Sequence, residues 1–325
     1  YGALTANISG SENTAIGRDA LDANTTGSNN TAVGKESLTT NTTGAQNTAV
    51  GMYGLRQTTT GSNNVAMGYA SLITNTTGIG NVALGHNSLY ANTTANNNTA
   101  VGTNSLLANT TGSANTAVGA LALDANITGT ELTAVGKSAL SASTGSYNTA
   151  MGSGAMANTT TATHNTAVGR IALSLNTEGA NNTAVGSRAL YATTTGANNV
   201  AVGYNSLTAN TTASYNTAVG YGALDANTTG AGGTALGFQA LSGNSTGADN
   251  TAVGINALFA NTTAANNTAV GKAALTTNTT GAINTALGSG ALQSNTTGAA
   301  LTAVGYDALK ANTTAVNNVA IGAYA

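Results

Sequence analysis

Residues 30–46 read NTAVGKESLTTNTTGAQ, and the same pattern returns along the whole chain of 325 residues. The block Asn30-Thr31-Ala32-Val33-Gly34 has equivalents whose glycine stands at residue 17 and then at every seventeenth residue. A single interval, from Gly136 to Gly152, spans 16 residues. Because a fixed short period is the signature of a repeat architecture, we expect a stack of small equivalent units.

Composition agrees with a repeat protein and excludes several other classes. Charged residues make up 6% of the chain, against about 25% in an ordinary soluble domain. A net charge of −2 gives no electrostatic attraction to nucleic acid or to anionic lipid. The absence of Cys excludes disulfides. No apolar run approaches the roughly 20 residues that span a bilayer, so we predict no membrane insertion by this segment.

Equivalent residues of successive repeats form columns, named here after their member in residues 30–46. The invariant Gly34 column predicts a positive φ or a close approach of two backbones. The Ala32 column also never varies, which predicts a tightly packed face, either inside the repeat or against another chain. The Val33 column is always apolar, and Leu or Met occupies the Leu38 column. We therefore predict that Val33 and Leu38 are the two core anchors of each repeat.

The Asn and Thr columns predict turns and ladders. Asn41-Thr42-Thr43-Gly44 has the composition of a turn. Stacked Asn side chains can hydrogen-bond along the axis of a repetitive β-structure. The residues expected to form such structural ladders are Asn30, Ala32, Val33, Gly34, Leu38, Asn41, Thr43 and Gly44.

These features predict an all-β fold, a parallel β-solenoid or β-roll of about 19 coils with a 17-residue repeat. One repeat cannot bury its own Val and Leu, so neighbouring coils must stack. We expect two or three short strands per coil and, at about 4.8 Å per coil, a rod on the order of 90 Å long. Residues 1–325 are expected to be one continuous repeat domain, uncapped at both ends and taken from a longer chain.

The motif resembles the head repeats of trimeric autotransporter adhesins of the YadA type and related repeats of phage tail fibres. Those heads carry an Asn-Ser-Val-Ala-Ile-Gly core, which Asn30-Thr31-Ala32-Val33-Gly34 matches in its later part. The resemblance implies parallel β-rolls, three chains side by side and a surface-binding role. The family's usual repeat is nearer 14 residues, and the extra residues here fall around Asn-Thr-Thr-Gly.

Two alternative roles follow from the Asn and Thr residues. The Asn-Thr-Thr triplets are formal N-glycosylation acceptors, so the chain is either a glycoprotein or carries these residues as a structural ladder. Glycans on successive coils at about 4.8 Å would crowd one another, which favours the ladder. Regular Thr columns such as Thr26, Thr43 and Thr60 also suggest ice binding. Adjacent Thr residues of a strand point to opposite sides, so Asn24 and Thr26 are the pair that would share a face.

The sequence predicts no enzyme, metal or cofactor. The two histidines, His86 and His164, are far apart in the chain. The acids number far fewer than one per repeat, against the several per turn that calcium-binding β-rolls need. The variable column after the glycine faces solvent or a partner, and four of its tyrosines are candidate contacts with a receptor or a glycan: Tyr69, Tyr204, Tyr221 and Tyr306.

We therefore expect an adhesive, structural fibre segment outside the cell, on a cell or virion surface. It would be a homotrimer or a filament that attaches to a host surface or glycan. The alternative is an ice-binding solenoid.

Overall fold

The computed structural model describes residues 2–325 as two compact units, which divide after Thr161. Both units are all-β, and each is described on its own. The strands of the first unit are β1 (Thr14–Ile16), β2 (Thr31–Val33), β3 (Thr48–Val50), β4 (Val65–Met67), β5 (Val82–Leu84), β6 (Thr99–Val101), β7 (Thr116–Val118), β8 (Thr133–Val135) and β9 (Thr149–Met151). Those of the second are β10 (Thr166–Val168), β11 (Thr183–Val185), β12 (Val200–Val202), β13 (Thr217–Val219), β14 (Thr234–Leu236), β15 (Thr251–Val253), β16 (Thr268–Val270), β17 (Thr285–Leu287), β18 (Thr302–Val304) and β19 (Val319–Ile321).

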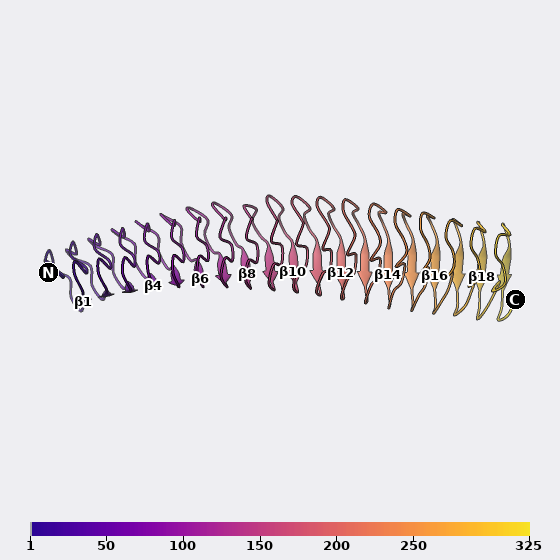
Figure 1. Ribbon diagram of the computed structural model, residues 1–325, viewed down its shortest axis with the longest axis horizontal. Helices are drawn as coiled ribbons and strands as arrows, with labels where there is room; N and C mark the ends of the chain where they lie inside the picture. Colours follow the sequence, from indigo (N-terminus) through magenta and orange to yellow (C-terminus); the bar gives the residue numbers. More distant parts are fainter. Residues whose placement is uncertain (1) are drawn as a thin grey trace. The chain divides into compact units, whose positions relative to one another are not determined.

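Within each unit every strand pairs in parallel with the next one along the chain. The register joins equivalent residues: Thr31 of β2 pairs with Thr48 of β3, and Ala32 pairs with Ala49. The labelled strands of the second unit lie side by side in chain order (Figure 1). The predicted parallel β-solenoid with a 17-residue repeat is therefore confirmed.

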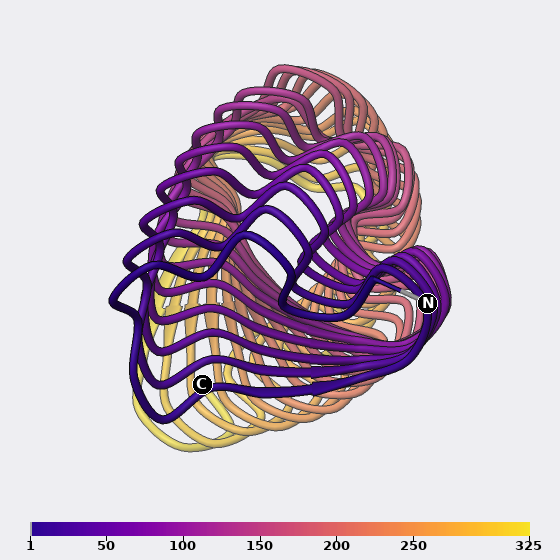
Figure 2. The ribbon, with the colours of Figure 1, turned by 90° about the vertical axis from the view of Figure 1, so that its left-hand side faces the viewer.

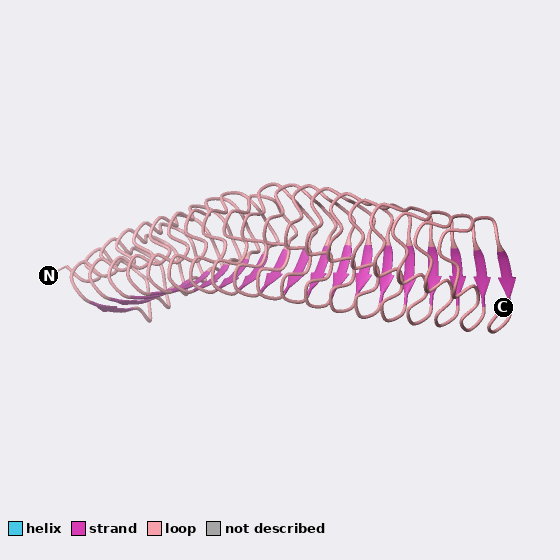
Figure 3. Cartoon of the chain, turned by 45° about the vertical axis from the view of Figure 1, so that its right-hand side comes forward, coloured by secondary structure: helices cyan, strands magenta, loops and turns pink. Residues whose placement is uncertain are grey.

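Each coil holds one strand of three residues, not the two or three strands expected from the sequence. The strands occupy one side of the coils, and turns and loops form the rest (Figure 3). Gly34 ends β2 with a φ of 132°. A Cβ atom there would lie 2.6 Å from the carbonyl oxygen of Gly51 in the next coil. Both reasons for the invariant glycine, positive φ and close backbone approach, are confirmed.

Left-handed residues bend the rest of the coil. Glu36, Leu38 and Gln46 have φ values of 55°, 50° and 59°. The backbone N–H of Ser37 donates to the carbonyl of Gly34, and that of Asn41 donates to Leu38, so two turns follow each other directly. A bulky left-handed residue is strained, and this conformation of Leu38 turns its side chain into the core, where it is 0% exposed.

Hydrogen bonds join neighbouring coils outside the strands as well. The N–H of Glu36 donates to the carbonyl of Arg18 at 2.8 Å, and the N–H of Leu38 donates to Gly54 at 3.0 Å. Viewed along the stack, successive coils of the first unit (indigo to magenta) keep nearly the same outline (Figure 2). The irregular segments thus have backbone partners in the next coil, as buried backbone requires.

The core contains Leu38 and Ala32 but not Val33, which corrects a prediction. Side chains alternate across a strand, so the strand Thr31–Val33 turns Ala32 inward and Thr31 and Val33 outward. Ala32 is 0% exposed. The equivalents of Val33 in the next two coils reach the surface: Val50 is 38% and Met67 is 44% exposed. The invariant Ala column therefore packs inside the coil. We call the outward side chains of the Thr31 and Val33 columns the strand face.

Candidate functional site

Asparagine side chains fill the polar part of the core. The Nδ2 of Asn41 donates to the Oδ1 of Asn24 in the preceding coil at 2.9 Å and to the carbonyl of Gly44 at 2.9 Å. The same pair of bonds recurs at Asn92, Asn109 and Asn126. Where successive coils both carry Asn, each amide bonds to its own turn and to the amide one coil away, so the ladder supports the coils it joins. The ladder is interrupted at Thr58, and the Oδ1 of Asn41 before it has no hydrogen-bond partner.

A second ladder runs through the Asn30 column. Asn30 accepts the backbone N–H of Asn47 at its Oδ1 (2.9 Å) and donates its Nδ2 to the carbonyl of Gly44 (2.9 Å). The two ladders thus converge on one carbonyl per coil. Gly44 itself is buried, and a Cβ there would lie 2.4 Å from the Oδ1 of Asn41.

Burial of the Asn41 column bears directly on glycosylation. Asn24, Asn41, Asn75, Asn92 and Asn109 are all 0% exposed. Their amide nitrogens, which a glycan would modify, donate hydrogen bonds inside the coil. In the folded chain these Asn-Thr-Thr triplets are structural, and no sugar fits on their amides.

The threonines of the triplets lie in different environments. The hydroxyl of Thr42 donates to the carbonyl of Thr59 in the next coil at 3.0 Å. Thr43 is exposed, while Asn41 beneath it is buried. The expectation that Asn24 and Thr26 share one face is therefore wrong, because the left-handed bends place the Asn in the core and the second Thr outside.

The strand face is an uncharged surface whose members are exposed or half-buried. In every described coil the Val33 column holds Val, Ile, Leu or Met, and the Thr31 column holds Thr or Val. Neither column contains a charged residue. Exposed members of the Val33 column include Ile16, Val50, Met67, Val118, Met151, Val185, Val219, Leu236, Leu287 and Ile321.

Aromatic rings stack in the column that follows the glycine, the Lys35 column. Tyr204 lies against Tyr221 with ring centroids 5.5 Å apart, and Tyr221 lies against Phe238 at 5.3 Å. In the first unit Tyr69 stacks on His86 at 5.3 Å. Tyr306 instead meets Tyr324 edge-on at 5.3 Å. Tyr69, Tyr204, Tyr221 and Tyr306 are 45%, 47%, 51% and 52% exposed.

A cluster of ion pairs surrounds Glu36 in the first unit. Its carboxylate lies 3.3 Å from Arg18, 3.5 Å from Lys35 and 3.1 Å from Arg56. Lys35 and Arg56 also lie over the ring of Tyr53, at 5.5 and 5.1 Å from its centroid. The cations are about half exposed, so solvent weakens these interactions.

Asp124 is the one carboxylate whose pKa is clearly raised among the described residues. Desolvation by burial raises the pKa, and hydrogen bonds from the backbone of Asp124 and Ala125 oppose the shift. Its Oδ1 is buried without a hydrogen-bond partner. No group of three or more acidic or His side chains within residues 2–325 is placed to hold a metal ion.

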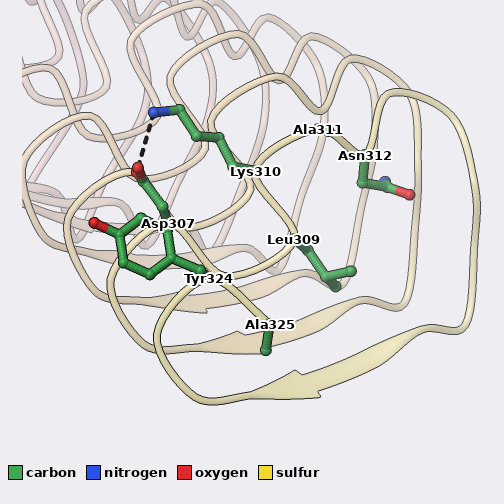
Figure 4. Close-up of a pocket in the computed structure, with 7 residues that line it drawn as sticks. All are labelled: Asp307, Leu309, Lys310, Ala311, Asn312, Tyr324 and Ala325. Carbon is green, nitrogen blue, oxygen red and sulfur yellow. Dashed lines mark hydrogen bonds and ion pairs between the residues drawn. The ribbon is translucent and has the colours of Figure 1, made fainter.

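A hollow of about 500 Å³ lies at the last coil, lined by Asp307, Leu309, Lys310 and Tyr324, among others (Figure 4). Lys310 donates to the carboxylate of Asp307 at 2.9 Å, and this hydrogen bond raises the pKa of the lysine. Leu309 belongs to the Leu38 column, whose interior members are covered by the next coil. The hollow thus lies against the core column in the last described coil.

No protein-family model matches this chain, and a search of the curated proteins finds no match. The likeness to adhesin heads and tail-fibre repeats stays an expectation from the motif. Among residues 2–325 no helix has the length and apolar character needed to cross a membrane.

The strand face was not predicted from the sequence. The signal was present, because the Val33 column is apolar in every repeat, but it was interpreted as core. The strand Thr31–Val33 has an apolar residue on each of its two sides, Ala32 on one and Val33 on the other. The path of the following turn decides which side faces inward.

Proposed function

We propose that the chain is a structural, adhesive segment of an extracellular fibre, in which copies associate laterally through the strand face. The observation that carries the proposal is an outward-facing column, exposed or half-buried, that is apolar in every described coil. The neighbouring column, at Arg18, Lys35, Tyr69 and Thr103, accepts basic, aromatic, aliphatic and hydroxyl residues. Solvent exposure alone would not restrict one column to Val, Ile, Leu and Met, whereas contact with another chain would.

The partner that fits this face is a second copy of the chain. An identical copy offers the same columns at the same spacing, and the face carries no charge to be left unpaired. A three-residue strand is about 10 Å long and coils repeat at about 4.8 Å. Each chain therefore offers about 900 Å² over its two units, close to the roughly 800 Å² that one partner gives to a stable interface.

A homotrimer is the assembly that the resemblance to adhesin heads implies. Location on a cell or virion surface and attachment to a host surface are part of the same proposal. The chain has few charged residues, and hydrogen-bonded polar ladders run along its coils. Both features suit a fibre that acts through its length and its repeated surface.

Charged substitutions on the strand face test the proposal. We expect the double variant Val185→Lys, Val219→Lys to shift the chain from oligomer to monomer, because each lysine would be desolvated in the interface. The matched control, Thr229→Lys with Thr246→Lys, puts the same charge on the exposed Thr43 column. Light scattering measures the masses. Equal masses for both variants would refute the role of the strand face.

Ice binding is the second candidate, and the strand face is also the observation that favours it. Thr48 and Val50 represent two parallel outward columns on one strand, and a regular Thr column on such a face is the feature that suggests ice binding. An ice-recrystallisation assay on the monomeric strand-face variant and on the unmodified chain separates the two roles. Inhibition that the lysines abolish would favour ice binding.

A further inference from the structure

Two arginines of the second unit stand side by side without an acidic partner. Arg170 belongs to the Lys35 column, and Arg188 belongs to the Glu36 column of the next coil. The backbone N–H of Arg188 donates to the carbonyl of Arg170 at 3.1 Å, so the two residues are neighbours across the coils. Within residues 2–325 neither arginine makes an ion pair of 4 Å or less. Their two positive charges are therefore left without a counter-charge from the protein.

The equivalent positions of the first unit show which group is missing. Lys35 is the equivalent of Arg170, and the carboxylate of the next residue, Glu36, lies 3.5 Å from it. The same carboxylate lies 3.1 Å from Arg56 in the following coil, so one acid joins cations of two coils. In the second unit the residue after Arg170 is Ile171, which is half-buried and carries no charge. The acid that joins the cations of the first unit thus has no counterpart beside Arg170.

An aromatic ring holds one of the two guanidinium groups. The Cζ of Arg188 lies 5.0 Å from the centroid of the Tyr191 ring. Tyr53 and Arg56 occupy the equivalent two positions in the first unit, with ring and cation exchanged, at 5.1 Å. A guanidinium that lies against a ring is restrained by cation–π attraction. Less conformational entropy is then lost when this guanidinium binds a ligand.

The hydrogen-bond donors of Arg188 lack acceptors in the protein. Its Nε is buried and has no hydrogen-bond partner. Its two Nη groups make no hydrogen bond within residues 2–325, and they reach solvent. A cation that is partly withdrawn from water without an acceptor is stabilised by a nearby negative charge more than a fully hydrated cation is. The Nη groups are the donors that such an anion can reach.

We propose that Arg170 and Arg188 bind a phosphate group, which lies beside Ile171 where the carboxylate of Glu36 lies in the first unit. Guanidinium groups form paired, charge-assisted hydrogen bonds with phosphate oxygens. The two arginines carry two positive charges, and a phosphate group carries nearly two negative charges at neutral pH. A monocarboxylate would neutralise only one of them. The site uses neither column of the strand face, so it is independent of lateral association.

Titration of the full chain with inorganic phosphate, followed by phosphorus NMR at about pH 8, tests the site in the doubly charged state of the ligand. We expect saturable binding. Arg170→Gln changes an exposed residue only and should weaken binding at least about tenfold, because charge-assisted hydrogen bonds are lost. Ile171→Glu should weaken it as much, because the new carboxylate would pair with the arginines as Glu36 pairs with its cations.

Lys272→Gln is the matched control for charge. Lys272 is an exposed cation of the Lys35 column, but the Glu36 column of the next coil holds Gly290 instead of a second cation. This variant loses the same charge as Arg170→Gln and should bind phosphate as the unmodified chain does. Absence of saturable binding, full binding by Arg170→Gln, or an equal loss in Lys272→Gln would overturn the inference.

Two further ligands identify the chemistry of the bound group. Acetate at equal ionic strength should displace phosphate only weakly, and displacement at an equal concentration would contradict a site for a doubly charged anion. Glycerol phosphate, a soluble phosphomonoester, separates the two sources of a phosphate group. Tighter binding of the ester than of inorganic phosphate would support an esterified ligand, and the reverse order would support the free ion.

Discussion

At the scale of single residues, the buried amides of the Asn41 column set the requirements of each coil. Asn92 donates to Asn75 and to the carbonyl of Ala95, and it accepts from Asn109 at 3.1 Å. The column admits Thr: Thr193 accepts a bond from Asn210 at 3.3 Å, whereas the buried hydroxyl of Thr159 has no hydrogen-bond partner. Charge is absent from the column in every coil.

Substitutions of Asn92 should therefore separate hydrogen bonding from size. Asn92→Ala leaves buried partners on both sides without bonds and should lower the free energy of local opening by about 3 kcal/mol. Asn92→Thr should lower it by only about 1 kcal/mol, since one hydrogen bond persists. Native-state hydrogen exchange of the flanking coils measures both. Equal losses for Ala and Thr would show that the amide contributes only volume.

Asp124 predicts how stability changes with pH. Burial raises its pKa above the usual 3.8, so the folded state holds the proton more tightly than the unfolded state. The stability of the chain should then fall as pH rises from about 4 through the raised pKa, and it stays lower above that. Asp124→Asn, which carries no charge, should be more stable at neutral pH and should lack this part of the dependence. Thermal unfolding between pH 3 and 7 measures it, and a variant with the unmodified pH profile would contradict the assignment.

At the scale of the element, the turn after each strand holds the strain of the fold. The Glu36 column is left-handed in every described coil and carries Asn at Asn87, Asn104, Asn205 and Asn256. Asn tolerates this conformation well, whereas a β-branched residue does not. Ile171 nevertheless occupies it with a φ of 49°.

Ile171→Asn should relieve this strain and stabilise the second unit by about 1 kcal/mol. The reverse change, Asn205→Ile, places a β-branched residue at the same turn and should destabilise by a similar amount. Chemical unfolding at one fixed chain concentration compares the two. A destabilised Ile171→Asn would mean that the side-chain packing of Ile171 outweighs its backbone strain.

Sequence patterns alone predicted the stacking but not the inside of the coil. The period, the invariant Gly34 and the β-branched Thr31 suffice for a parallel solenoid, because every explanation of each agrees with stacked strands. Val33 and Ala32 are both apolar and lie on opposite sides of the strand, so alternation alone does not decide which of them faces the core. The left-handed Leu38, which backbone preference disfavours, brings the second anchor inward and leaves Val33 outside.

At the scale of the whole molecule, the candidate surfaces follow from which side of each strand faces inward, the Ala32 side or the Val33 side. Once Ala32 faces inward, the apolar Val33 column must face outward in every coil, and a surface of that kind calls for a partner. The tyrosine column could be predicted as exposed from its variability. The stacking of Tyr204, Tyr221 and Phe238 joins residues of successive coils, so the order of residues in one coil does not reveal it.

The mass of the purified chain in solution, measured by light scattering across a range of concentrations, tests the central claim most directly. Lateral association through the strand face predicts a mass above that of one chain, and the proposed homotrimer predicts a stable mass three times the 31.4 kDa of one chain. A mass of one chain at every concentration would contradict it, because the strand face would then be stable in water without a copy against it.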